Sequence, residues 1–231
     1  YNWGPCLIKV NILDDFKEVL LEEAKKTEVD YKDKLAGQIA KERGYSDKQR
    51  EKIIPYLDEL SDEAKEIGAV NTICFENNKR IGYNTDIFGF TESLRVNSIN
   101  NIDNMIIMGT GGAAKTIIFF CKKNKIPFNI VSRKNSKDYL SYRDIDHSFF
   151  RGNVLIVNCT PVGTYPNINK CPDLPYNLVE KENILYDLVY NPSETLFIKK
   201  GKEIGCKTLN GYEMLKFQAE MSWNLWTKSS E

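Results

Sequence analysis

The chain has 231 residues, enough for one large domain or two smaller ones, each with its own core. Lysine and arginine total 32, and aspartate and glutamate also total 32, so the formal net charge is zero and the chain lacks the basic surplus that a nucleic-acid backbone requires. The longest apolar runs, such as Met105–Met108 and Thr116–Cys121, are too short to cross a bilayer, and no charged-then-apolar leader opens the chain. We therefore expect a cytoplasmic protein without nucleic-acid or membrane partners.

The first fifty residues contain one apolar run and two charged helical patterns, which predict one strand and two helices at Cys6–Leu13, Asp14–Lys26 and about Tyr31–Arg43. A further helix is expected from Ser46 to about Ile67, with Pro55 bending it or starting its second half and Gly68 ending it. Residues 69–90 are expected to be extended. Within them, Val70–Phe75 and Arg80–Tyr83 flank a hairpin turn at Glu76–Lys79.

From about residue 102 the pattern alternates between apolar runs and helical segments. Strands are predicted at Met105–Met108, Phe128–Val131, Asn153–Asn158 and Ile184–Val189, and helices at Ala113–Lys123 and Glu194–Ile204. An amphipathic helix, Tyr212–Thr227, ends the pattern. Strands that alternate with helices indicate an α/β fold with a parallel, doubly wound sheet.

Six cysteines are present, and none forms a C-x-x-C pair. Buried or incidental reduced thiols are favoured over a disulfide framework or a zinc site. The single histidine, His147, has no cysteine or second histidine nearby and is a poor candidate for catalysis or metal binding. We expect no metal.

The segment Met105–Ala114 has the character of a strand, a tight turn and a helix start. It fits G-x-G-x-x-A with Gly109, Gly111 and Ala114. The first glycine permits the turn, the second lets the backbone approach a pyrophosphate, and the alanine allows close packing of helix on strand. The helix N-terminus adds N–H groups and partial positive charge, so the segment predicts a dinucleotide site.

The residues after the next strand indicate which dinucleotide binds. NAD-binding proteins usually place an acidic residue there to hold the ribose 2′-hydroxyl. This chain has Ser132, Arg133 and Lys134 instead, with Lys137 close by. A solvated basic loop would look the same in isolation. After a glycine turn, however, the cations favour a 2′-phosphate, and hence NADP.

Several segments resemble the motifs of the shikimate dehydrogenase family, in the family's order. Gly68–Thr72 and Gly82–Asp86 resemble its paired GAVNT and G-Y-N-T-D motifs. Further resemblances are the glycine loop Gly109–Ala114, the 2′-phosphate clamp Ser132–Lys134, the N-A-T-P-V-G motif at Asn158–Gly163, the D-L-V-Y-N-P-x-x-T motif at Asp187–Thr195, and a closing G-x-x-M-L-x-x-Q at Gly211–Gln218. The resemblance covers roughly residues 51–231.

Membership of this family would imply a Rossmann-type NADP-binding domain at residues 89–210 and a smaller α/β substrate domain at residues 1–88. The first 50 residues of that domain form an atypical, mostly helical segment, and a final helix at residues 211–231 packs back on it. The implied reaction is the reversible reduction of 3-dehydroshikimate to shikimate in the chorismate pathway of aromatic amino acid biosynthesis, by a monomer or homodimer. The resemblance assigns the substrate to Asn71, Asp86, Tyr190 and Gln218, with Asp86 catalytic. It assigns NADP to Gly109, Thr110, Gly111, Gly112, Ala113, Ser132, Arg133, Lys134, Thr160 and Gly211.

The first fifty residues depart from the family. Its serine motif for the substrate carboxylate and its N-V-T-x-P-x-K motif, which carries a catalytic lysine, do not occur there. Arg50 stands at the lysine position, and arginine stays protonated and is a poor proton shuttle. Two hypotheses follow: an NADP-dependent shikimate dehydrogenase with impaired turnover, or an inactive NADP-binding module with a foreign N-terminal segment.

Overall fold

The computed structural model describes residues 7–8, 53–133 and 137–228. The two helices expected at Asp14–Lys26 and Tyr31–Arg43 therefore lie outside the described residues. Of the apolar run Cys6–Leu13, the described part is strand β1 (Leu7–Ile8). The chain divides into two compact units: a first unit of residues up to Gly89 together with those from Leu215 onward, and a second unit, Phe90–Met214. Each unit is described below by itself.

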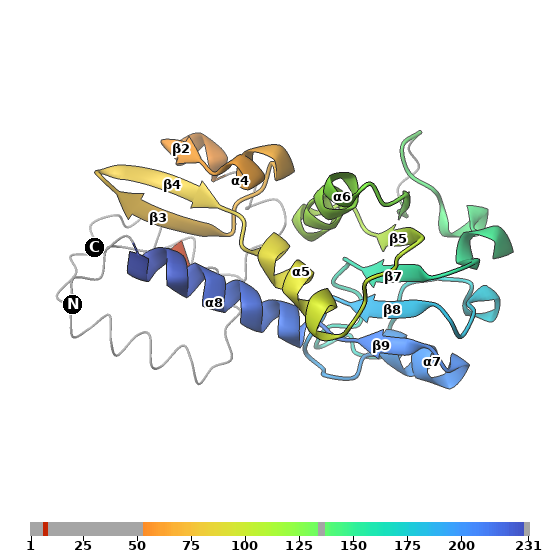
Figure 1. The fold of residues 1–231 in the computed structure, drawn as a ribbon. Helices are drawn as coiled ribbons and strands as arrows, with labels where there is room; N and C mark the ends of the chain where they lie inside the picture. Colours follow the sequence, from red (N-terminus) through yellow and green to blue (C-terminus); the bar gives the residue numbers. More distant parts are fainter. Residues whose placement is uncertain (1–6, 9–52, 134–136, 229–231) are drawn as a thin grey trace. The chain divides into compact units, whose positions relative to one another are not determined.

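The second unit is built on a parallel five-stranded sheet, in the order β6-β5-β7-β8-β9 (Figure 1). Helix α6 packs on β5, and α7 packs on β8 and β9. The strands are β5 (Asn104–Met108), β6 (Phe128–Val131), β7 (Val154–Asn158), β8 (Ile184–Asp187) and β9 (Lys207–Leu209), and the helices are α6 (Gly112–Asn124) and α7 (Leu196–Ile204) with short 3₁₀ turns η2 (Tyr142–Asp144), η3 (His147–Phe150) and η4 (Tyr176–Leu178). The predicted doubly wound α/β sheet is confirmed.

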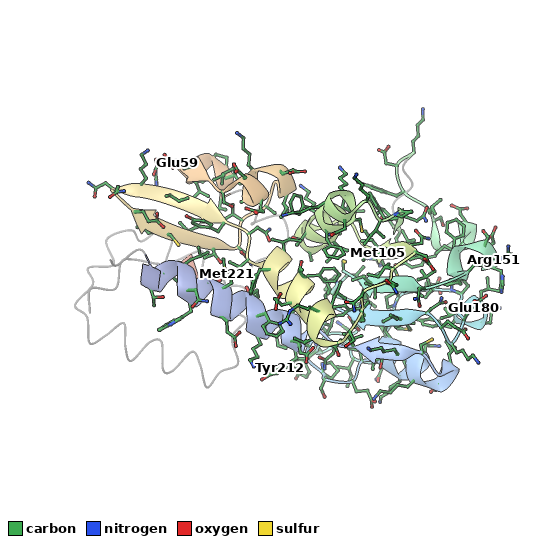
Figure 2. All side chains as sticks on the ribbon, viewed as in Figure 1. Glu59, Met105, Arg151, Glu180, Tyr212 and Met221 are labelled. Atoms are coloured by element: carbon green, nitrogen blue, oxygen red, sulfur yellow. The ribbon has the colours of Figure 1, made fainter. Side chains whose placement is uncertain are left out.

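The central strands are buried along their length because both sheet faces are covered. Met105 on β5 lies among the packed side chains of this unit (Figure 2) and is fully buried, as are Val154–Val157 on β7. This is why the sequences of these strands are continuous apolar runs, without alternation of polar and apolar residues. After β5 the chain forms β6 on one side of that strand, and it then crosses back to form β7 on the other side. Such a reversal makes the carboxyl ends of β5 and β7 the expected place for a ligand.

The first unit contains a mixed sheet in the order β1-β3-β4-β2. Strands β3 (Thr72–Glu76) and β4 (Lys79–Tyr83) form an antiparallel hairpin, as predicted, and β2 (Glu59–Leu60) runs parallel to β4. Asn77 and Asn78 form the turn with φ of 50° and 62°. Two left-handed residues are what a two-residue hairpin with matching twist requires, and asparagine tolerates them. A cluster of buried side chains from Ile53, Ala64, Val70 and Ile73 forms this unit's core.

Two longer helices have residues in both units. Helix α5 (Asp86–Val96) follows β4, and α8 (Tyr212–Lys228) ends the described chain. The predicted C-terminal helix is confirmed. The indole nitrogen of Trp226 on α8 donates a hydrogen bond to the Ile73 carbonyl of β3 at 3.2 Å. That contact helps to fix the helix against the sheet within the first unit.

The expectation of one helix from Ser46 to Ile67 is wrong over its described part. Residues 54–67 contain a 3₁₀ turn η1 (Ile54–Tyr56), strand β2 and a short helix α4 (Asp62–Ile67). Pro55 stands in the first turn of η1, and Leu57 is already extended, so no helix passes through this region. Ser61 starts α4 afresh by accepting a hydrogen bond from the Ala64 N–H, and Gly68 ends it with φ of 68°, as predicted.

Other boundaries also differ from expectation. Residues 86–90 were expected to be extended but are the start of α5. Strand β9 was missed because its three residues, with one exposed lysine, carry no strong pattern of their own. Among the described residues, five cysteines are present and none forms a disulfide. Four of these five are buried, in agreement with the expectation of buried thiols.

Candidate active site

Buried polar side chains converge in the first unit, around the open end of the β3–β4 hairpin. Thr72 pairs with Tyr83, and the Asn71 N–H donates to the Tyr83 carbonyl at 3.0 Å. The residue before β3 is therefore held next to the residues after β4. This antiparallel register is the reason that the two motifs Gly68–Thr72 and Gly82–Asp86 meet in space.

The amide of Asn71 is the centre of this cluster. Its Nδ2 lies 2.9 Å from Asp86 Oδ1 and 3.3 Å from Gln218 Oε1. Its Oδ1 accepts a hydrogen bond from the Thr85 backbone N–H at 2.8 Å. Three of the four predicted substrate residues, Asn71, Asp86 and Gln218, are thus brought together, and each is less than 10% exposed. Asp86 is the first residue of α5, where a carboxylate is favoured by the helix dipole.

Three hydroxyl groups that the sequence analysis did not single out belong to the same cluster. Thr72, Thr85 and Ser222 lie within 3.2 Å of one another, oxygen to oxygen. Ser222 stands on α8 one turn after Gln218, and that i,i+4 spacing on a helix is the signal that could have placed it on the same face. A second asparagine, Asn84, binds the Ala69 carbonyl at 3.0 Å and so braces the loop between β4 and α5.

In the second unit, the glycine turn after β5 lies directly against the loop after β7. Gly109 has φ of 115°, and a Cβ there would lie 3.1 Å from Thr160 Cγ2 and 3.3 Å from the Cys159 carbonyl. Gly111 is the N-cap of α6 and has no side chain to cover the first-turn N–H groups. Thr110, Gly112 and Ala113 complete the turn. The geometry leaves backbone N–H groups at the carboxyl edge of the sheet, where an anion fits.

The loop after β7 is held by a network of hydrogen bonds between buried polar side chains. Asn158 Oδ1 accepts hydrogen bonds from the Thr160 N–H at 3.0 Å and the Thr160 hydroxyl at 2.6 Å. Its Nδ2 donates to Asp187 Oδ1 at 2.9 Å. Asp187, fully buried, also accepts from Thr195 Oγ1 at 2.6 Å and from the Val189 N–H at 3.0 Å. Burial raises the pKa of Asp187 to about 6, although these three donors favour the charged form and partly offset the rise.

The basic segment follows β6. Ser132 is buried, and its N–H donates to the Leu140 carbonyl at 2.9 Å, while Arg133 is exposed. Lys134 lies outside the described residues. Burial raises the pKa of the nearby Tyr142 hydroxyl to about 12, an effect that the positive charge of Arg133 reduces.

The remaining predicted residues stand at the carboxyl side of β8. Tyr190 is half-buried in the loop after β8. Gly211 packs on the same loop, because its N–H donates to the Val189 carbonyl at 3.2 Å and a Cβ there would lie 2.1 Å from the Leu188 carbonyl oxygen. No side chain fits at position 211. Arg50 lies outside the described residues.

Within the described part of the chain, no group of three or more histidine, cysteine or carboxylate side chains could hold a metal ion. His147 instead faces Glu180, with Nε2 3.2 Å from Oε1. Among the described helices, none combines the length and apolar character that crossing a bilayer requires. The sheet order and the glycine turn at its switch point define a dinucleotide-binding α/β protein, and the first unit adds a buried cluster of amides and a carboxylate.

The chain is similar to several known proteins. A shikimate dehydrogenase (NADP(+)) of Clostridium beijerinckii is 42% identical over 188 residues, which cover 77% of this chain and 68% of the relative. The Methanococcus vannielii enzyme of the same name is 36% identical over 195 residues, covering 76% and 68%. The structure of the Thermus thermophilus shikimate 5-dehydrogenase with NADP(H) and shikimate superimposes with a TM-score of 0.69 at 29% identity, over 78% of this chain and 70% of that one. No protein-family model matches the chain.

At this identity and coverage the relationship is established. The chain belongs to the shikimate dehydrogenase family.

Proposed function

We propose that the chain is an NADP-dependent shikimate dehydrogenase, an oxidoreductase that interconverts 3-dehydroshikimate and shikimate. The observation that carries the proposal is the Asn71–Asp86–Gln218 cluster in a chain that also has the glycine turn of a dinucleotide site. Hydrogen-bonding donors and an acceptor carboxylate at fixed positions suit a ligand with several hydroxyl groups. The protein would act in the cytoplasm, with small molecules as its partners.

The cofactor half of the proposal rests on three features of the second unit. The turn at Gly109–Gly112 offers N–H groups for the pyrophosphate of NADP, Thr160 borders that turn, and Arg133 is an exposed cation after β6 where a 2′-phosphate would lie. Ser132, Lys134 and Gly211 are assigned to the same site by the sequence motifs. The bound cofactor supplies or accepts the hydride.

The substrate half assigns the ligand hydroxyls to Asn71, Asp86 and Gln218, with Asp86 in the proton-transfer role and Tyr190 beside the cofactor. In this assignment residues up to 88 and the final helix form the substrate domain, and residues 89–210 form the cofactor domain. Arg50 in place of the family's lysine predicts slow turnover, because losing a positioned acid–base group typically costs on the order of a hundred- to ten-thousand-fold in rate.

The deciding experiment is an assay of shikimate-dependent NADP reduction by the purified chain, with Asp86→Ala and Arg50→Lys as variants. We expect turnover far below the rate of about ten per second that is typical of enzymes, a further loss in Asp86→Ala and a gain in Arg50→Lys. Ordinary turnover by the unmodified chain would refute the assigned role of position 50. NADP binding without any shikimate turnover in all three proteins would favour an NADP-binding module without this activity.

A further inference from the structure

The orientation of the Asn71 amide follows from its neighbours. Its Oδ1 faces a backbone donor, the Thr85 N–H, at 2.8 Å. Its Nδ2 lies 2.9 Å from Asp86 Oδ1, 3.3 Å from Gln218 Oε1 and 3.1 Å from the Thr85 hydroxyl, which can accept or donate. A flipped amide would place its oxygen against the Asp86 carboxylate oxygen and its nitrogen against the Thr85 N–H, whereas the Thr85 hydroxyl, which also lies 3.2 Å from Asn71 Oδ1, can donate or accept and fits either orientation. Only one orientation is compatible with this network.

That orientation determines the orientation of Gln218 in turn. Because Gln218 Oε1 accepts from Asn71, the Nε2 at the other corner of its planar amide is directed away from Asn71. The cluster therefore has a fixed polarity: Gln218 presents N–H donors, and Asp86 presents a carboxylate. A ligand hydroxyl, which both donates and accepts, satisfies this pair, whereas a carbonyl, an ether or an ammonium group satisfies only one member.

Ser222 links the helical turn that carries Gln218 to the neighbouring strand and loop through hydrogen bonds. Its Oγ donates to the Gln218 carbonyl at 2.8 Å, one helical turn back along α8. Since a hydroxyl has a single hydrogen, the same oxygen must then accept from Thr72 at 2.8 Å or Thr85 at 3.0 Å. These hydroxyls come from β3, from the loop before α5 and from α8, and all three side chains are less than 5% exposed. The turn of α8 that carries Gln218 is thus attached to the two segments that carry Asn71 and Asp86.

We propose that Ser222, together with Thr72 and Thr85, is a positioning residue that holds Gln218 so that its Nε2 donates to a ligand hydroxyl whose proton faces Asp86. This inference rests on the proposed function, since it deepens the reading of the substrate cluster. None of the three hydroxyls needs to touch the ligand. They act through the amides of Asn71 and Gln218.

The test compares Ser222→Ala with Asn224→Ala, an exposed substitution on the same helix that serves as the matched control. Equilibrium binding of shikimate to the protein loaded with NADPH, which cannot oxidise it, should weaken about tenfold or more in Ser222→Ala, as expected for a lost buried hydrogen bond. NADP affinity should stay within about twofold, because the cofactor residues are assigned to the other unit. Thr72→Ser, which keeps the hydroxyl, should retain the affinity for shikimate, and the isosteric Thr72→Val, which lacks it, should lose affinity. If Ser222→Ala does not fold, the comparison of these two variants takes its place.

A second readout needs no ligand. In nitrogen-15 NMR spectra, the side-chain amide signals of Asn71 and Gln218 should shift in Ser222→Ala and stay in place in Asn224→Ala. If the unmodified chain does not bind shikimate, the proposed function fails, and the NMR comparison still decides the positioning role. If it binds shikimate and Ser222→Ala binds equally well with unmoved amide signals, the positioning role is overturned while the proposed function stands.

Discussion

Replacing Asp187 by asparagine should change how the stability of the protein depends on pH. Asp187 is fully buried, and burial raises its pKa from 3.8 to about 6. Between those values the folded protein keeps a proton that the unfolded chain releases. The stability contributed by the neutral form is therefore complete below the unfolded pKa and is lost as the pH rises through the folded pKa. An asparagine side chain at this position would carry no charge at any pH.

The size of the effect follows from the shift. A displacement from 3.8 to about 6 corresponds to about 3 kcal/mol, because each unit is worth about 1.4 kcal/mol. Of this, about 2 kcal/mol develops between about pH 4.5 and pH 7.5. Asp187→Asn also weakens contacts to Thr195 and Asn158, but that loss does not depend on pH in the same way. The informative quantity is therefore the difference in free energy of unfolding between the two proteins, and how that difference changes with pH.

The measurement is urea unfolding of both proteins, followed by circular dichroism across that pH range. The free energy of unfolding of the unmodified chain should fall relative to that of Asp187→Asn as the pH rises. Asp58→Asn is the control: hydrogen bonds from Arg80 lower the pKa of Asp58 to about 2, so it stays ionised when folded and contributes little slope above about pH 5. Parallel pH curves for the unmodified chain and Asp187→Asn would refute the argument.

Three further substitutions test other parts of the structure. Arg133→Ala should reduce the preference for NADP over NAD, measured by titration with both cofactors, since the charged partner of the 2′-phosphate is lost; equal affinities in the unmodified chain would contradict the assignment. Gly211→Ala should destabilise the fold by about 3 kcal/mol or more in urea unfolding, because its Cβ would lie 2.1 Å from the Leu188 carbonyl oxygen; an unchanged midpoint would show that this loop yields. Tyr186→Phe removes a buried hydroxyl that donates to Ser93 at 2.7 Å and should cost about 1 kcal/mol; a more stable variant would show that the hydroxyl is poorly satisfied.

The local sequence pattern was sufficient to predict those strands, turns and helix ends that depend on neighbouring residues in the chain. Continuous apolar runs predicted β5 to β8 to within a few residues, because a strand covered on both faces needs apolar side chains throughout. The hairpin turn at Asn77 and Asn78 and the helix stop at Gly68 were predicted for the same kind of reason, since left-handed backbone selects few residue types. The glycine turn after β5 was recognised because its residues lie within one strand–turn–helix segment.

Features that depend on distant partners were not predicted. The helix expected up to Ile67 is interrupted by β2, a two-residue strand that exists only because β4 lies beside it. Strand β9 likewise depends on β8. Short elements of this kind have almost no periodicity, and their backbone hydrogen bonds come entirely from another part of the chain.

The same division applies to the candidate site. The resemblance to the family's motifs singled out Asn71, Asp86 and Gln218 as substrate residues, and a carboxylate and two amides suit the hydroxyl-bearing ligand that the resemblance implies. Only the tertiary structure decided which corner of each amide faces which neighbour, because that depends on the Thr85 N–H and on hydroxyls from three separate elements. A hydrogen bond is directional and acts over about 3 Å, so its partners are determined when the chain segments pack together and cannot be read from their order along the chain.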